Sequence, residues 1–235
     1  MSADRKAHLR GLLADRDGVT NLLRGVCELC VTELAVSGAR VRVLGGVRAN
    51  DSGALVYATD PVSTKLEDLA ATAGVGPSFD AFERQFPVLI PDLTRENSRW
   101  PGFTAGALAA GAAAIFTFPL QVGGVRVGVL ELHRDRTGSL TSAQLTDAFL
   151  LADTATDTIL DDLLGVTPMT LPGLVEIQPE VHQATGFVAV DLGVTLQDAL
   201  LRIRGHAFAH ELTLVDVARQ IIGRRLRLEP GNDRS

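Results

Sequence analysis

The sequence predicts an α+β fold in which a larger domain with an antiparallel sheet, residues 1–164, precedes a small helical domain, residues 176–228. The larger domain mixes helical spacing of apolar residues with alternating segments. Its clearest hairpin turns at Gly123-Gly124, where glycine supplies the positive φ that a two-residue turn requires. The helical domain shows successive amphipathic patterns joined by loops of only a few residues. Residues 165–175 contain two prolines, two glycines and no charge, which predicts a linker.

The first elements of the larger domain follow from the spacing of their apolar residues. Residues 4–16 and 19–36 place leucines, valines and cysteines at helical intervals. Residues 39–47 and 54–59 alternate apolar side chains with others, as half-buried strands do. We therefore expect two helices followed by two strands.

The remaining elements of this domain are a helix, a short strand, the hairpin and a long helix. Residues 63–73 have helical spacing, with Ser63 as the expected N-cap. Residues 87–90 form a short strand pattern, and the hairpin pairs 113–121 with 126–134. Residues 141–164 carry one continuous apolar stripe, which predicts a long amphipathic helix.

The helical domain carries three start signals. Gln178-Pro179 begins the first helix with proline at its favoured first position, and Gly193 ends it. The spacing of Thr195 and Asp198 resembles a capping box, and Thr213 with Asp216 repeats it. Residues 229–235 have no apolar spacing and are expected to form a disordered tail.

The length, the composition and the number of cysteines exclude several classes of protein. With 235 residues and 46% hydrophobic content, the chain is globular and long enough for one medium and one small domain. No apolar run approaches the roughly 18 residues that a spanning helix needs. The charged N-terminus lacks an export signal, and two cysteines make no disulfide framework. These features predict a cytoplasmic protein without a membrane partner.

The net charge of −6 argues against a chain built wholly to hold polyanions. Residues 176–228 are neutral, with no lysine; their six arginines are Arg202, Arg204, Arg219, Arg224, Arg225 and Arg227, and their six acids are Glu176, Glu180, Asp191, Asp198, Glu211 and Asp216. Nucleic-acid binding would therefore depend on a few placed contacts, for which the planar guanidinium suits phosphates and bases.

Motifs for catalysis or metal binding are weak. Cys27 and Cys30 lie three residues apart on the apolar face of a helix, without a second pair, so we interpret them as core residues. His206 and His210 do not form a metal set by spacing. No Ser/His/Asp order or cofactor signature rises above chance, so neither an enzyme nor a catalytic or metal site is expected.

A second group of candidates surrounds Gly74-Val-Gly-Pro77, which lacks the Lys-Ser/Thr of a phosphate loop. Loop residues beside a sheet often line ligand pockets. The candidates for an unidentified small-molecule ligand are Gly76, Pro77, Asp80, Asp92 and Trp100. The alternative is equally open: Trp100 fills a core edge and the two acids cap turns.

The helical domain resembles an ANTAR domain. The residues that carry the resemblance are Val181-His-Gln-Ala-Thr-Gly186 in the first helix, then Ala199-Leu200, Ile203-Arg204, Ala207 and Val217-Ala218. Glycine at position 186 costs about 1 kcal/mol relative to alanine in a helix, which suggests close approach of a partner helix or an RNA backbone.

The larger domain resembles a GAF domain of the kind that precedes ANTAR modules in actinobacterial regulators. The resemblance lies in Gly74–Pro77 with Asp80-Ala-Phe82, Pro87–Asp92, Arg99–Gly102 and Phe118-Pro-Leu120. Related chains often have Gly-Glu-Gly-Pro-Cys where this one has Gly-Val-Gly-Pro-Ser. The missing acid and thiol weaken any transfer of a ligand or redox role.

Together the resemblances imply an RNA-binding transcription antiterminator. Such proteins bind paired stem-loops in nascent RNA, usually as dimers, and so keep a terminator from forming ahead of RNA polymerase. GAF domains bind small molecules or dimerise as sensors, so the first domain would gate RNA binding. The expected RNA contacts are Gln183, Ala184, Thr185, Gly186, Arg202, Arg204 and Arg219.

Two further expectations concern partners. The helical domain is alternatively a ligand-gated module for a protein or duplex DNA, and DNA ranks lower because the third helix begins with an acidic turn at Asp216. A homodimer is expected through residues 141–164, joined by 19–36, where Ala148, Ala152 and Ala155 permit close packing.

Overall fold

The computed structural model describes residues 2–14, 16–44, 53–163 and 179–228. The predicted linker, the predicted tail and the end of the predicted strand 39–47 lie outside the described residues. The chain divides into two compact units. Unit 1 comprises Met1–Ala70 and Val75–Ile177, and unit 2 comprises Ala71–Gly74 and Gln178–Ser235.

Unit 1 is built on a five-stranded antiparallel sheet in the order β2-β1-β5-β4-β3. Its strands are β1 (Gly38–Leu44), β2 (Gly53–Ala58), β3 (Val88–Ile90), β4 (Ala114–Val122) and β5 (Val125–Arg134). Gly123, with φ of 57°, turns β4 into β5, so the predicted hairpin is confirmed. The predicted α+β class is confirmed as well.

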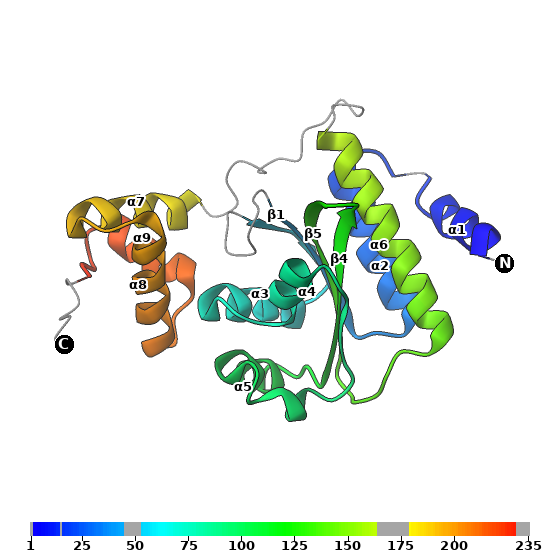
Figure 1. Ribbon diagram of the computed structural model, residues 1–235, viewed down its shortest axis with the longest axis horizontal. Coiled ribbons are helices and arrows are strands. Elements are labelled where there is room, and N and C mark those ends of the chain that lie inside the picture. The colour runs from blue at the N-terminus through cyan, green and yellow to red at the C-terminus, as the bar shows by residue number, and fades with distance from the viewer. Residues whose placement is uncertain (1, 15, 45–52, 164–178, 229–235) are drawn as a thin grey trace. The chain divides into compact units, whose positions relative to one another are not determined.

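Helices cover both faces of this sheet (Figure 1). On one face lie α2 (Val19–Leu34) and α6 (Ser142–Leu163). On the other lie α3 (Pro61–Ala73), α4 (Pro77–Arg84) and α5 (Pro101–Ala109), with a short 3-10 turn, η1 (Leu93–Glu96). Each face has its own apolar cluster: Val26, Phe118 and Leu151 belong to the first, and Phe82, Phe103 and Ile115 to the second.

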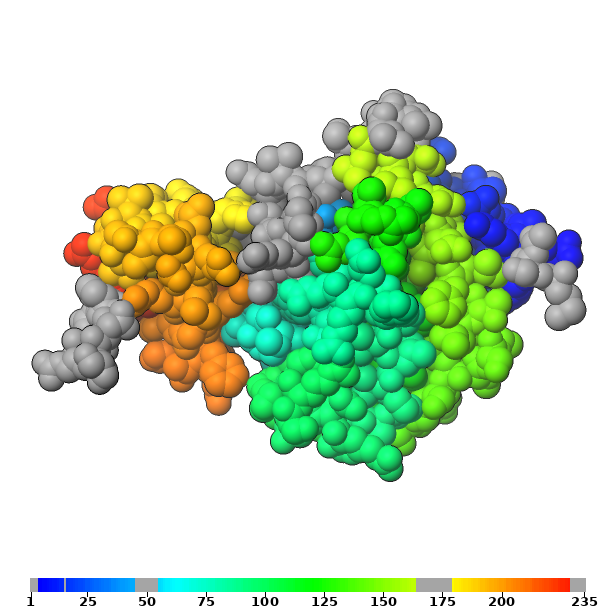
Figure 2. All heavy atoms as spheres, in the orientation of Figure 1, coloured from blue at the N-terminus to red at the C-terminus, as the bar shows by residue number. Residues whose placement is uncertain are grey.

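The segment between α3 and β4 is more regular than the sequence predicted. Residues interpreted as irregular form α4, η1 and α5. Pro77 and Pro101 stand in the first turns of α4 and α5, where the missing N–H of proline costs nothing. Short helices of this kind carry too few periodic residues for the pattern to stand out. Figure 2 shows the side chains of this region packed into a continuous surface.

The predicted cap of α3 was wrong. The helix begins at Pro61, and the Asp60 carboxylate accepts hydrogen bonds from the Ser63 N–H at 3.0 Å and the Ser63 hydroxyl at 2.7 Å. Burial acts to raise the pKa of Asp60. Hydrogen bonds from Ser63 and Thr59 outweigh this effect and hold the pKa below its usual value. An aspartate two positions before the first apolar residue is an equally good capping signal.

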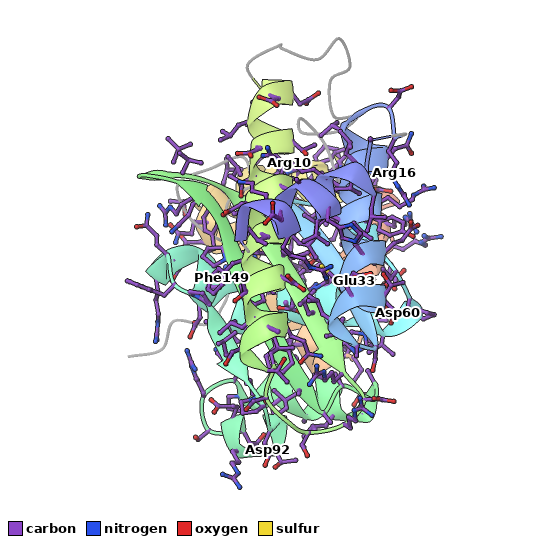
Figure 3. The ribbon with its side chains drawn as sticks, turned by 90° about the vertical axis from the view of Figure 1, so that its right-hand side faces the viewer. Arg10, Arg16, Glu33, Asp60, Asp92 and Phe149 are labelled. Carbon is purple, nitrogen blue, oxygen red and sulfur yellow. The ribbon has the colours of Figure 1, made fainter. Side chains whose placement is uncertain are left out.

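The first helix, α1 (Ser2–Gly11), is shorter than predicted and lies across α2 and α6 (Figure 3). The Arg5 guanidinium reaches Glu33 of α2 at 2.7 Å and Asp147 of α6 at 2.9 Å. Leu13, which follows α1, packs closely on Gly25 of α2. A Cβ added to Gly25 would lie 2.6 Å from the Leu13 side chain. This close approach explains a glycine inside α2.

The alanines that were expected to serve a dimer are used within the chain. Ala148, Ala152 and Ala155 are at most 5% exposed and belong to the cluster between α6 and the sheet. They therefore pack against the chain's own core, and a homodimer through α6 would use other residues.

Apart from Ala71–Gly74, the described part of unit 2 is built on three helices: α7 (Pro179–Leu192), α8 (Leu196–Ala209) and α9 (Leu214–Ile222). The predicted capping signals of α8 and α9 are confirmed. The Thr195 hydroxyl oxygen accepts from the Asp198 N–H and donates to the Asp198 carboxylate, and Thr213 does the same with Asp216. The core is small and alanine-rich, with Ala184, Ala199, Ala207 and Ala218 buried among valines, leucines and isoleucines.

Among the described residues, no single helix has the length and apolar character needed to cross a membrane. Only the bent pair α7 and α8, at 108° to each other, meets these criteria when the two helices are taken together.

Candidate nucleic-acid interface

One side of α7 is exposed and carries an unusual mixture of side chains. Gln183, Gly186, Phe187 and Val190 fall within roughly 100° of arc when successive residues are turned by 100°. Phe187 is 48% exposed and Val190 is 85% exposed. A Cβ added to Gly186 would meet no atom within 4 Å. We call these four residues the α7 stripe.

A groove of about 870 Å³ lies beside the α7 stripe, between α7 and the segment that follows α9. Its walls are Gln183, Phe187, Val188, Val190, Asp191 and Leu192 from one side and Ile221, Ile222, Arg224, Leu226, Arg227 and Leu228 from the other. Most of these side chains are apolar, and guanidinium groups occur on one side only. The groove therefore offers an apolar floor with positive charge at its edge.

The exposed arginines of α9 and of the segment that follows it form only weak ion pairs or none among the described residues. Arg227 pairs with Asp191 at 3.3 Å and Arg219 with Glu180 at 3.2 Å, and both arginines are mostly exposed. Such surface pairs contribute only about 0–1 kcal/mol. A hydrogen bond from its own backbone N–H, together with the Arg219 guanidinium, lowers the pKa of Glu180. Arg224 and Arg225 are exposed and pair with no acid among the residues that the structure describes.

The predicted RNA contacts are distributed over the surface and the core of unit 2. Gln183, Gly186 and Arg219 have exposed or half-exposed positions, and the first two share the α7 stripe. Ala184 is fully buried, and Thr185 is 7% exposed with its hydroxyl donating to the Val181 carbonyl at 2.6 Å. These two side chains therefore support the helix that carries the stripe.

Arg202 and Arg204 lie half-buried on α8. Phe187, Arg224 and Arg227 also belong to the surface around Gln183, although the sequence did not predict them as RNA contacts. Phe187 stands four residues after Gln183, so the helical period alone would have placed it on the same side.

His206 and His210 also lie at the end of α8. Their rings stack with centroids 4.1 Å apart, and a ring nitrogen of His210 contacts the His206 carbonyl at 2.9 Å. Burial, and to a lesser extent the charge of His210, lower the pKa of His206. No group of three His, Cys, Asp or Glu side chains suited to a metal ion occurs within the described residues.

The two cysteines are confirmed as core residues. Cys27 and Cys30 are free thiols with no exposed surface, on the side of α2 that faces the sheet. Burial raises the pKa of both thiols well above the usual value, which disfavours the reactive thiolate.

The predicted ligand residues of unit 1 are gathered around α4, η1 and α5. Gly76 precedes α4 with φ of 146°, and a Cβ there would meet the Phe103 ring at 3.4 Å. Pro77 is buried in the first turn of α4. Trp100 is 2% exposed and belongs to the apolar cluster on this face of the sheet.

The two predicted acids are held by neighbouring groups. Asp80 pairs with Arg99 at 2.5 Å. Asp92 caps η1, where its carboxylate accepts from the Thr94 N–H at 3.2 Å. Hydrogen bonds from Thr94 lower the pKa of Asp92. These predicted ligand residues thus lie in one region of unit 1, and each contacts its neighbours there.

A buried ionic network crosses the sheet of unit 1. The Arg40 guanidinium contacts the carboxylates of Glu67 and, at 2.7 Å, Glu131; the Thr117 hydroxyl donates to Glu131 at 2.9 Å. Burial acts to lower the pKa of Arg40, but Glu131 and Glu67 outweigh it and hold the pKa above its ordinary value. This network ties β1, β4 and β5 to α3.

Replacing Gly186 with alanine should stabilise unit 2. The new methyl group meets nothing within 4 Å, and alanine is favoured over glycine inside a helix by about 0.5–1 kcal/mol. Hydrogen exchange of the α7 amides should slow accordingly. Gly205→Ala in α8, where an added Cβ is equally free, is the matched control and should slow exchange in its own helix. Unchanged or faster exchange in α7 would mean that another group already occupies this space.

Comparison with known proteins reveals similarity of fold. No protein-family model matches the chain, and no curated protein matches its sequence. Among solved structures, the GAF domain of a phosphoenolpyruvate-protein phosphotransferase from Acinetobacter is similar with a TM-score of 0.53 at 13% identity, covering 71% of this chain and 98% of that one. A domain assigned to a two-component sensor histidine kinase of Sinorhizobium meliloti 1021 gives 0.52 at 13% identity, covering 64% and 96%.

A third structure, of a protein in its far-red-absorbing dark state with bound biliverdin, has a TM-score of 0.48 at 8% identity and covers 66% of this chain and 97% of that one. The first two similarities agree with the five-stranded antiparallel sheet and the helices on its two faces. The α+β part of the chain therefore has the fold of GAF domains.

Proposed function

We propose that this protein is a signal-responsive, RNA-binding transcription antiterminator without enzymatic activity. Unit 1 would sense a signal, and unit 2 would hold tandem stem-loops in nascent RNA so that a terminator does not form. The observation that carries the proposal is the α7 stripe beside exposed arginines, in a segment whose residues resemble an ANTAR domain. Sensing is supported by the GAF fold of unit 1 and by the similarity of that fold to the domain assigned to a sensor histidine kinase.

RNA is favoured over duplex DNA because of where the charges lie. A DNA-reading helix carries basic side chains in its first turn. The first turn of α9 instead contains Asp216, engaged with Thr213, and the first turn of α8 contains Asp198, engaged with Thr195. Arg224 and Arg225, which pair with no acid in the described part of the chain, follow α9, and Arg224 lines the same groove as the exposed Phe187 ring, which suits splayed bases and flexible phosphates.

The proposal includes a homodimer and an indirect effect on RNA polymerase. Two copies would let one assembly hold two stem-loops at once, which raises the effective concentration of the second loop. A ligand of unit 1 would shift RNA binding only if it binds the two states of the chain with different affinity.

A single-round transcription assay tests this function. The templates would carry leaders from the same genome that fold into tandem small-loop hairpins overlapping a terminator. The wild-type chain should increase read-through, and Arg224→Gln/Arg227→Gln should reduce the increase because two phosphate contacts are lost. Arg95→Gln, at an exposed arginine of unit 1, is the control and should behave as wild type. No read-through on any such leader would contradict the proposal.

A further inference from the structure

The floor of the groove beside the α7 stripe consists of apolar side chains that a small helical unit would ordinarily bury. Phe187 and Val190 present large apolar surfaces to solvent, and Ile221 and Leu226 continue the apolar lining. Among the described residues of unit 2, no side chain fills the space of about 870 Å³ between them. Contiguous exposed apolar surface with a polar rim is typical of a binding site.

The polar groups of the groove are few and differ in kind. Gln183 contributes a side-chain amide, which both donates and accepts hydrogen bonds. Arg224 contributes a guanidinium with no ion pair among the described residues, and Arg227 contributes one whose exposed pair with Asp191 costs little to break. The single acid of the lining, Asp191, is thus the partner of an arginine.

These groups match the parts of an unpaired nucleotide. A base has a flat apolar face that stacks on an aromatic ring, a polar edge that an amide can read, and a phosphate that a guanidinium can bind. Gly186 adds a stretch of α7 with no side chain beside Phe187, so a sugar-phosphate backbone can approach the helix closely. A protein helix in this groove would bury the Arg224 guanidinium, and unlike an RNA backbone it carries no regular anionic group to pair with it.

We propose that the groove is the base-binding site of unit 2, in which Phe187 stacks on an unpaired loop base of the RNA. Gln183 contacts the edge of that base, and Arg224 and Arg227 contact the adjoining phosphates. This assignment rests on the proposed RNA-binding function and makes it specific: affinity comes from bases that are splayed out of the loop. A paired stem cannot supply such bases.

The test uses the full-length chain and a pool of stem-loop RNAs with a common stem and a short randomised loop. Phe187→Ala should weaken binding by about 5- to 100-fold, the loss expected for one stacked base. Phe187→Tyr should retain binding because it keeps the ring. Phe208→Ala is the matched control: Phe208 is 60% exposed on α8 and does not line the groove, so its loss should leave affinity unchanged.

The outcomes separate the base-binding site from the function. If the wild type binds the pool but Phe187→Ala binds equally well, or if Phe208→Ala loses as much affinity, the groove is not the base site. Equal binding of a loopless duplex with the same stem would also overturn the assignment while leaving RNA binding intact. If the wild type binds no stem-loop at all, the proposed function itself fails.

A last control addresses a second copy of the chain as the occupant of the groove. Sedimentation of the wild type and Phe187→Ala should show the same oligomeric state. Circular dichroism should show that the variant keeps its helices, since the ring is half exposed. Dissociation of a wild-type dimer on replacing Phe187 would assign the groove to protein contact and overturn the proposal.

Discussion

Replacing Arg40 with methionine should destabilise unit 1 by about 3–5 kcal/mol, because it leaves the buried carboxylates of Glu67 and Glu131 without their shared counter-ion. Arg40 is 2% exposed, so water cannot take the place of the guanidinium. The measurement is urea unfolding followed by tryptophan fluorescence. Trp100 is the only tryptophan and is buried in unit 1, so its emission reports this unit alone.

Two further variants separate lost charge from lost volume. Arg40→Met combined with Glu131→Gln should recover part of the stability, since the remaining carboxylate, Glu67, keeps Arg42 as its partner at 3.3 Å. Arg10→Met, at the exposed pair with Asp157, should change stability by at most about 1 kcal/mol. If Arg40→Met unfolds at the same urea concentration as the wild type, the network is not buried as described.

Replacing Gly128 with alanine should cost at least about 3 kcal/mol, because the methyl group has no space between β5 and β1. Gly128 pairs with Val43 in the centre of the sheet. The added Cβ would contact the Arg42 carbonyl oxygen and lie 3.1 Å from the Val43 Cα, which are both backbone atoms. Relief therefore requires separating two central strands. Thermal unfolding followed by Trp100 fluorescence measures the loss.

Gly124→Ala is the matched control for this prediction. It lies in the turn of the same hairpin, where an added Cβ meets nothing within 4 Å, and it should shift stability by no more than about 0.5 kcal/mol. If the two alanine variants melted at the same temperature, the register of β1 against β5 would have to differ from that described.

Residues with a clear period or a clear turn signal were predictable from the sequence. The Gly123-Gly124 hairpin and the threonine caps of α8 and α9 depend on local chemistry, and each occurs where the sequence predicted it. The helices α4 and α5 were not predictable, since they are held by contacts to the sheet and are too short to show a period of their own. Tertiary packing, which the sequence does not display, decides such segments.

The candidate site was predictable in part for the same reason. Gln183 and Gly186 could be placed on α7 from the sequence, but the side of α7 that is exposed depends on how α8 and α9 pack. Ala184 and Thr185 were expected to contact RNA because they belong to the quoted motif, and the structure places both in the core. Phe187 and the arginines after α9 meet at one groove only because the helices bring distant parts of the chain together.

The most direct test of the central claim is a fluorescence anisotropy titration of the wild-type, full-length chain with the stem-loop pool across a range of salt concentrations. The loopless RNA duplex and a DNA duplex of the same sequence serve as competitors. We expect the stem-loops to bind most tightly, with a slope of log K against log salt of about −2 to −4, as a few phosphate contacts imply. Equal affinity for all three, or no binding at low salt, would contradict the claim that unit 2 recognises looped RNA.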